Sequence, residues 1–293
     1  MNSYIRRCAG IIMLLCLILL IPMEVLAFVE ESILLNFETE KRDAILFPFG
    51  YFTYVDDNGN IKRSYNEELI KGFEYPNPWK NSQNFIASLR EHILYKSSNI
   101  GQTLKDIDGL MAHFIESGYI FPRPSYNHFE EGWVSCMDAL PVAVSCQLAW
   151  EITGDAKYKK YRDVLILHSI KKPKEPSFVL HFPDGKSWLS EYASADPKER
   201  LEKEYYVLNG YLIGLHSLKI LSYTTGDKSL EELYVSSLEK YKEIAEQFYY
   251  NNGEWCYYML SPLDINQTHY VIFETVELDG LYALTGDPFF AEE

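Results

Sequence analysis

The tripeptide Thr-Gly-Asp occurs three times in this chain, in LAWEITGDAKYKKY (148–161), LSYTTGDKSLEELY (221–234) and LYALTGDPFFAEE (281–293). Glycine can take the left-handed conformation that ends one helix, and aspartate can cap the N-terminus of the next. Each copy is therefore predicted to be the tight turn of a helical hairpin. The turns are 72 and 60 residues apart, so each repeat holds a hairpin and a longer excursion.

Apolar residues around these turns recur with the period of a helix, for example along 208–218 and 230–248. Three further helices are predicted over 85–96, 103–117 and 133–152. The total is about seven helices, or roughly four hairpins. Such a series closes most economically into an all-α fold of the α/α toroid type, an incomplete barrel whose inner helices surround a cleft.

Two regions are predicted not to be helical. Residues 51–55 and 57–61 have the pattern of a small N-terminal β-hairpin, because Asn58-Gly59 suits a type I′ turn. Residues 171–206 form an excursion of 36 residues with four prolines. Compact domains rarely contain so long a connector without a reason, so this segment is predicted to be functional.

The chain begins with the pattern of a secretory signal peptide. Arg6 and Arg7 precede an apolar run over 11–22, and Val25-Leu26-Ala27 offers a small-residue cleavage site. We therefore expect a signal peptide over 1–27, an extension with the β-hairpin over 28–80 and the toroid over 81–293. The protein is expected to be secreted or to lie in the cell envelope, with an uncleaved membrane anchor as the alternative.

Charge and cysteine content narrow the function classes. A net charge of −15 argues against binding nucleic acid through the overall field. An anionic substrate would need a local basic lining, for example from Arg123, Lys172, Lys186 or Lys203. The three cysteines after the signal peptide are too few for a disulfide framework. No metal or phosphate-binding motif stands out, so no cofactor is expected.

Several short stretches follow the order of motifs in one known family. They are GWVSCM (132–137), Ser190-Glu191-Tyr192, Leu208-Asn209-Gly210-Tyr211, Tyr258-Met259-Leu260 and Thr268-His269. The chain resembles the catalytic domain of the heparosan-glucuronate (D-glucuronyl) C5-epimerases, in which Trp-x-Ser-x-Met, Glu-Glu-Tyr, Leu-Asn-Gly-Phe and Tyr-Asp-Leu occupy these places. The resemblance covers roughly residues 80–293.

The resemblance implies an isomerase that converts D-glucuronate units of a polysaccharide to L-iduronate. The C5 proton leaves from one face of the sugar and returns on the other, which requires an acid and a base. By position in the motifs, Tyr192 and Tyr258 are the acid–base candidates, and Glu191 is expected to orient or tune one of them. The substrate-binding candidates are Trp133, Trp188, Tyr206, Asn209, His269 and Tyr270. A homodimer is a further expectation.

Two positions depart from the family. Ile265 stands where the family has another tyrosine, and Ser261 where it has an arginine. Two alternatives therefore stay open. One is a toroid glycoside hydrolase or lyase, since hydrolysis needs two carboxylates and the chain offers Glu191, Glu204, Glu254 and Asp264. The other is a non-catalytic glycan-binding protein. Several candidates also have a purely structural interpretation, such as a core anchor for Trp133 or a helix start for His269.

Overall fold

A computed structural model of the chain describes residues 32–50, 53–55, 61–63, 77–95, 100–125, 130–194, 206–251, 253–260 and 263–292. The predicted signal peptide lies outside these residues. The predicted boundary at residues 80 and 81 falls inside a helix that begins at Pro78. The proposed division of the chain stays a prediction.

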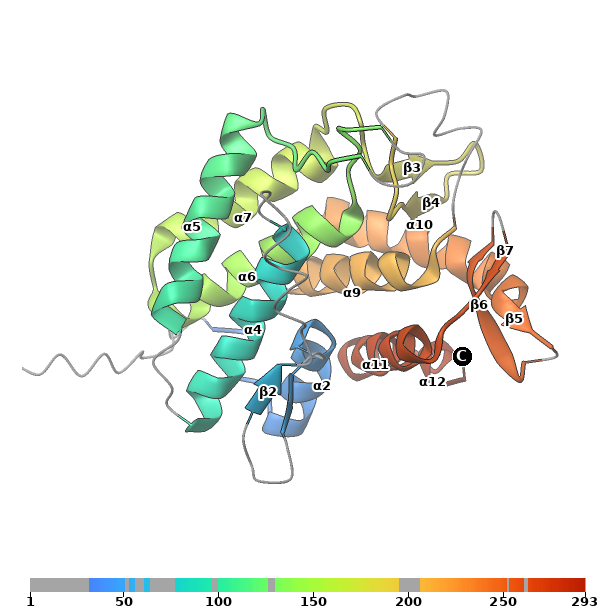
Figure 1. Cartoon of the computed structure of the whole chain (residues 1–293), viewed down its shortest axis with the longest axis horizontal. Coiled ribbons are helices and arrows are strands. Elements are labelled where there is room, and N and C mark those ends of the chain that lie inside the picture. The colour runs from blue at the N-terminus through green and yellow to red at the C-terminus, as the bar shows by residue number, and fades with distance from the viewer. Residues whose placement is uncertain are drawn as a thin grey trace, which may run out of the picture.

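The described part of the chain is mainly helical, as predicted (Figure 1). Its α-helices are α2 (Thr39–Gly50), α4 (Pro78–Tyr95), α5 (Ile100–Glu116), α6 (Cys136–Thr153), α7 (Ala156–Ile166), α9 (Leu208–Thr225), α10 (Lys228–Ile244), α11 (Thr268–Thr285) and α12 (Phe289–Glu292). A π-helical turn, Leu167–Lys171, extends α7, and a 3₁₀ turn, Ala245–Phe248, extends α10.

The three Thr-Gly-Asp turns share one set of hydrogen bonds. Gly154, Gly226 and Gly286 have φ values of 69°, 66° and 69°. In each turn the threonine hydroxyl donates to the carbonyl four residues earlier and accepts from the aspartate N–H. The aspartate Oδ1 then accepts from the backbone N–H two residues later. The predicted helix ends and caps are therefore present.

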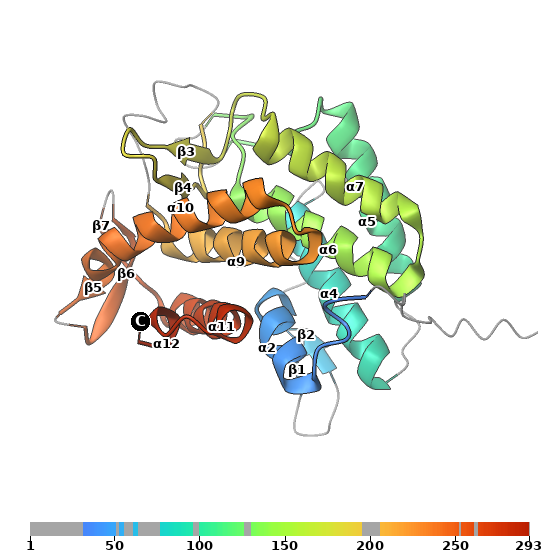
Figure 2. The same cartoon turned by 180° about the vertical axis from the view of Figure 1, so that it is seen from behind.

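Five helices contact one another in succession. Helix α2 packs on α4, α4 on α6, α6 on α9, α9 on α11, and α11 on α2. The other helices pack on this set from outside: α5 mainly on α4 and also on α6, α7 on α6, α10 on α9 and α12 on α11. Figures 1 and 2 show α6 and α9 in the interior and α5, α7 and α10 on the outside.

The helices in the interior are buried on all sides. Almost every side chain of α6 and α9 is buried, from Cys136 to Ile152 in the first and from Leu208 to Ser222 in the second. A helix with no polar face has to be covered by neighbours all round. Cys136 and Cys146 are both fully buried on α6 as free thiols.

Short antiparallel sheets complete the fold. Strands β1 (Thr53–Val55) and β2 (Ile61–Arg63) pair as an N-terminal hairpin, as predicted, but the second strand begins at Ile61, where the prediction for it ended. The turn residues lie outside the described chain. The excursion contains a second hairpin, β3 (Val179–His181) and β4 (Ser187–Leu189). A third sheet is formed by β5 (Tyr249–Tyr250), β6 (Trp255–Leu260) and β7 (Leu263–Ile265). Both β4 and β6 pack against α9, which places these segments near the same helix.

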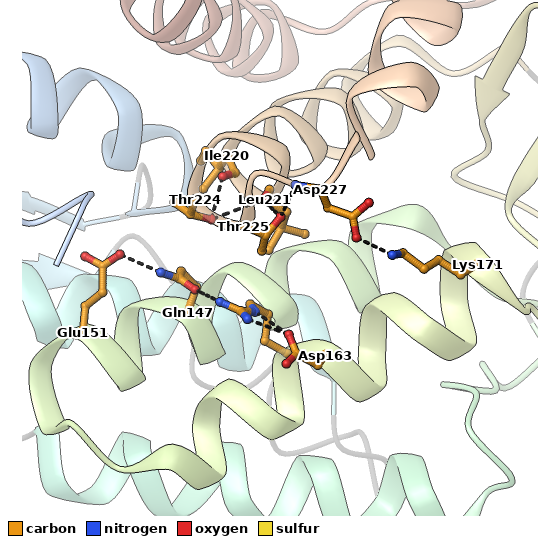
Figure 3. A network of polar contacts seen from close by, with 10 residues as sticks. Gln147, Glu151, Asp163, Lys171, Ile220, Leu221, Thr224, Thr225 and Asp227 are labelled. Carbon is orange, nitrogen blue, oxygen red and sulfur yellow. Dashed lines mark hydrogen bonds and ion pairs between the residues drawn. The ribbon is translucent and has the colours of Figure 1, made fainter. Parts of the chain in front are cut away.

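A buried polar network ties the beginning of the described chain to the interior. Glu151 Oε2 accepts from the Ser32 hydroxyl at 2.8 Å and from the N–H groups of Leu34 and Leu35 at 3.0 and 3.2 Å. Its other oxygen accepts from Gln147, which in turn binds Arg162 of α7 (Figure 3). A fully buried carboxylate is tolerated when it is hydrogen bonded in this way.

None of the helices among the described residues combines the length and the apolar character that a membrane crossing requires.

Candidate functional site

A short stretch of paired backbone holds the GWVSCM segment (132–137) beside the excursion (171–206). The N–H groups of Val134 and Ala193 each donate to the other's carbonyl, at 3.0 and 2.9 Å, and Cys136 donates to the Ser190 carbonyl at 3.0 Å. Because Val134 is engaged in this pairing, α6 begins only at Cys136, after the cap Ser135, and not at residue 133 as predicted. The pairing holds residues 190–193 beside the N-terminus of α6.

Trp133 and Tyr192 meet at this pairing. Their ring centroids lie 5.3 Å apart, and the Trp133 indole N–H donates to the Pro124 carbonyl at 2.8 Å. The Arg123 guanidinium lies 5.1 Å from the Trp133 ring and forms a bidentate ion pair with Asp138, at 2.7 and 2.5 Å. Trp133 is thus a buried wall of the site, fixed on two sides.

The N-terminus of α9 forms the floor beneath Glu191. A β-carbon added to Gly210 would lie 2.4 Å from Glu191 Oε2 and 2.6 Å from its Cβ, so only glycine allows this approach. Val207 bridges to Met259, and Leu260 donates its N–H to the Tyr206 carbonyl at 3.1 Å. These contacts carry β6, and Tyr258 with it, to the same helix end.

Three predicted catalytic side chains come together there. Tyr192 is hydrogen bonded to Glu191, and Tyr258 is hydrogen bonded to Tyr192. The Tyr258 ring also packs on Tyr270, with centroids 4.9 Å apart. The fold therefore brings together side chains from two distant segments, and these form a continuous series of hydrogen bonds from Tyr258 through Tyr192 to the Glu191 carboxyl.

Burial sets the protonation states of the Glu191 carboxyl and the Tyr258 phenol. It raises the pKa of Glu191 to about 7, although the hydrogen bonds from Tyr192 and the Gly210 backbone and the charge of Arg123 oppose the rise. Burial, followed by the charge of Glu191 and the neighbouring tyrosines, raises the pKa of Tyr258 far above its usual value. Near neutral pH the carboxyl can therefore exchange a proton, while the Tyr258 phenol stays protonated.

Glu274 of α11 is a member of the site that the sequence analysis missed. It is 3% exposed, and its Oε2 accepts from the Asn266 amide at 2.6 Å, with Cys256 Sγ at 3.7 Å. Burial raises the pKa of Glu274 to about 8, and the charge of Glu191 contributes. Its Oε1 is buried without a hydrogen-bond partner. Only its place on the apolar face of α11 could have marked it in the sequence, because no motif contains it.

The predicted binding residues divide into buried and accessible ones. Trp188 is fully buried and stacks on Tyr211 with centroids 3.8 Å apart, so it supports the site from behind. Asn209 is 4% exposed, and its Oδ1 has no hydrogen-bond partner. Tyr206 and Tyr270 are partly exposed. The side chain of His269 lies outside the described part of the chain. All of these binding roles stay predictions.

The predicted basic lining is largely engaged elsewhere. Arg123 pairs with Asp138, and Lys186 pairs with Asp184 and Glu243. Lys172 is exposed, and Lys203 lies outside the described residues. Arg123 is therefore the cation whose charge reaches Glu191. Among the described residues, no cluster of histidine, cysteine or acidic side chains has the composition of a metal site.

The fold and the site define a mainly helical protein with a buried tyrosine–carboxyl cluster. The family model described as the D-glucuronyl C5-epimerase C-terminus matches residues 114–293. The chain therefore belongs to this family, as its motifs predicted.

A relative from the archaeon Methanocaldococcus jannaschii, described as an uncharacterized protein, is 28% identical over 197 residues. That alignment covers 66% of this chain and 60% of the relative. The chain thus spans about three-fifths of the length of the curated relative that it matches.

Proposed function

We propose that this protein is an epimerase that inverts C5 of uronic-acid units, of the D-glucuronate to L-iduronate type, within a polysaccharide. Membership of the family supports an epimerase-type role. The observation that carries the finer proposal is the chain of hydrogen bonds from Tyr258 through Tyr192 to Glu191. It places two phenols and a carboxyl together.

The hydrogen bonds and the raised pKa of Tyr258 indicate which phenol is the base and which is the acid. The Tyr192 hydroxyl donates to Glu191, so Glu191 can draw off its proton and make Tyr192 the base for the C5 hydrogen. Tyr258, held in its protonated form, is the acid that returns a proton to the opposite face of C5 once the bound sugar has separated the two phenols. The phenolate left on Tyr258 and the phenol formed on Tyr192 are neighbours, so a proton can pass from Tyr192 to Tyr258. The proton held by Glu191 then returns to Tyr192, and the starting state is restored.

Negative charge develops on the sugar carboxylate when the C5 proton leaves. It needs preorganised donors. We assign this role to the Asn209 amide, in the first turn of α9, and to the Arg123 guanidinium. Neither replaces the family arginine position by position, because that position is Ser261.

The proposal extends to architecture and location. The succession α2, α4, α6, α9, α11 and back to α2 supports the incomplete α/α toroid. The N-terminal sequence supports secretion or a place in the cell envelope. A polysaccharide containing uronic acid is the proposed substrate, and a homodimer remains part of the prediction.

The proposal is tested by incubating the protein with a glucuronate-containing polysaccharide, heparosan, in heavy water. Epimerisation predicts deuterium at C5 and iduronate signals in the NMR spectrum, with the chain length unchanged. No exchange at C5 after prolonged incubation, with the polymer bound, would instead identify the non-catalytic glycan-binding protein.

Glycoside hydrolysis is the second candidate, and one observation favours it. Glu191 and Glu274 are both buried carboxyls, and the charge of Glu191 raises the pKa of Glu274. Hydrolysis uses one protonated and one ionised carboxyl across the scissile bond. The other acidic candidates fit less well, since Glu254 and Asp264 are exposed and Glu204 lies outside the described residues. New reducing ends in the same incubation would establish this alternative, and unsaturated ends would indicate a lyase.

A further inference from the structure

A pocket of about 310 Å³, part of it open solvent, lies beside the tyrosine–carboxyl cluster. Asp138 and Ser135, at the start of α6, form the wall nearest the cluster. The other lining residues come from the segment after α5 (119–121), from the π-helical turn (168–169) and from the excursion (173–178). Tyr192, Tyr258 and Glu191 do not line it, so it is separate from the proposed acid–base groups.

Two lining segments have unusual backbone. Gly118 and Tyr119 form the turn after helix α5, and the Tyr119 N–H donates to the Phe114 carbonyl at 2.8 Å. Tyr119 has a φ of 71°, which a bulky residue adopts only at a cost of about 1–3 kcal/mol. The second segment is the π-helical turn Leu167–Lys171, which carries His168 and Ser169 into the lining. Both features are concentrated at functional sites in proteins.

The strained turn places an aromatic ring between two basic side chains. The Tyr119 ring stacks on His168 with centroids 3.9 Å apart and an interplanar angle of 13°. The Lys174 ammonium lies 5.6 Å from the same ring. Lys174 is exposed and forms no ion pair with the described residues. Asp138, the acidic group in the lining, is already paired twice with Arg123.

This arrangement is suited to a small anionic group on an apolar body. A protein with a net charge of −15 repels an anionic polymer overall, so binding requires locally unneutralised cations. Lys174 supplies positive charge, and Ser169 supplies a buried hydroxyl at the same wall. The Tyr119 ring, which stacks on His168, adds apolar surface to the wall of the pocket.

We propose that the pocket formed by Tyr119, His168, Lys174 and the start of α6 binds the carboxylate of a second uronic-acid unit, further along the polymer than the unit that reacts. This inference rests on the proposed function for the identity of the polymer. Lys174 is a positioning residue here, because it would hold the chain and not the reacting carbon.

Binding of a heparosan hexasaccharide, measured by calorimetry, tests the proposal. Lys174→Gln should weaken this binding about tenfold, the loss of one charge-assisted hydrogen bond. Lys160→Gln removes the same charge from an exposed lysine of α7 outside the pocket and should change the affinity less than twofold. The carboxyl-reduced hexasaccharide should bind wild type and Lys174→Gln equally.

Equal affinities of the two variants for the hexasaccharide, or equal effects of Lys174→Gln on both ligands, would overturn the proposal. The outcome is separable from that of the proposed function. If wild type exchanges no C5 hydrogen but the carboxylate-specific effect of Lys174 persists, the subsite stands without the epimerase. If exchange occurs, Lys174→Gln should raise KM and leave kcat unchanged, and an unchanged KM would refute the subsite.

Discussion

At the scale of single residues, Gly210 sets the position of Glu191. A methyl group at this place would lie 2.4 Å from the carboxyl oxygen, well inside contact distance. Gly210→Ala should therefore displace Glu191, break its hydrogen bond with Tyr192 and lower C5 exchange at least about 100-fold, the usual contribution of general acid–base catalysis. The exchange rate and the thermal midpoint of the variant are the measurements.

Gly109→Ala is the matched control for this variant. Gly109 is an exposed residue of α5, and nothing lies within 4 Å of an added β-carbon. The substitution should stabilise the protein by about 0.5–1 kcal/mol through helix propensity and leave exchange unchanged. Equal exchange rates in both glycine variants would show that the close approach of Glu191 is irrelevant.

Glu274 gives the protein a predictable pH dependence. Its folded-state pKa of about 8 lies above the ordinary value of 4.5, so the folded state binds the proton more tightly than the unfolded state. This stabilising contribution is complete below about pH 4.5 and is lost as the pH rises through about 8. Glu274→Gln keeps an acceptor for Asn266 and removes the titration.

The thermal midpoint of Glu274→Gln should thus match wild type at pH 5 and exceed it by about 5 °C at pH 9. The exposed carboxylate Glu239 provides the control, because Glu239→Gln should follow wild type at both pH values. A Glu274→Gln midpoint that stays parallel to wild type across this range would mean that Glu274 is ionised in the folded protein.

The sequence located the residues of the site that belong to local motifs. Tyr192, Tyr258 and Glu191 were selected by their place in family-like stretches, and the structure brings them together. Glu274 and the stacked Tyr119 and His168 were not selected, because their environment depends on long-range packing. Burial of Trp188 was likewise invisible, since a tryptophan in a loop is equally consistent with a sugar contact.

At the scale of elements, the Thr-Gly-Asp turn is the unit that the sequence predicts best. Its glycine needs a left-handed φ, and its aspartate caps the next helix, so both are local requirements. Gly226→Ala should lower the free energy of unfolding by about 1 kcal/mol because φ is 66° there. Gly226→Asn should lose less, since asparagine tolerates this conformation.

Chemical denaturation measures both variants. Identical stabilities of Gly226→Ala and wild type would contradict the role of the turn glycine. The Gly109→Ala variant, with the opposite expected sign, shows that the method resolves the effect of an added methyl group.

The hairpins of the excursion and of β5–β7 were harder to predict. Strands β3 and β4 have three residues each, too few for a period of two to be recognised. The helix α2 also escaped the analysis, because its apolar and polar residues do not segregate to opposite faces. Helix periodicity predicts long elements well, whereas short ones depend on their packing.

At the scale of the whole molecule, Glu151 joins the beginning of the described chain to α6 and, through Gln147, to α7. Glu151→Leu removes the acceptor of the Ser32 hydroxyl and of the Leu34 and Leu35 amides, and leaves these donors buried. The free energy of unfolding should fall by about 3 kcal/mol. Hydrogen exchange at the two amides should accelerate more than exchange within α9.

Uniformly faster exchange in both places would mean that the network stabilises the fold globally and does not specifically hold the first segment. The sequence could not reveal this network, because Glu151 lies 119 residues from Ser32 and no motif contains either residue. The sequence also could not show the order in which the helices contact one another. The toroid was predicted only because consecutive hairpins close most simply into a ring.

The central claim is that Tyr258 and Tyr192 move a proton at C5 of a uronic-acid unit. It is tested most directly by the rate at which tritium leaves C5 of a labelled glucuronate polymer in the presence of wild type, Tyr192→Phe and Tyr250→Phe, because Tyr192 is the proposed base. Tyr250 is an exposed tyrosine of strand β5, so its variant is the control. We expect Tyr192→Phe to slow release at least about 100-fold and Tyr250→Phe to leave it within twofold. Equal release by Tyr192→Phe and wild type would contradict the account.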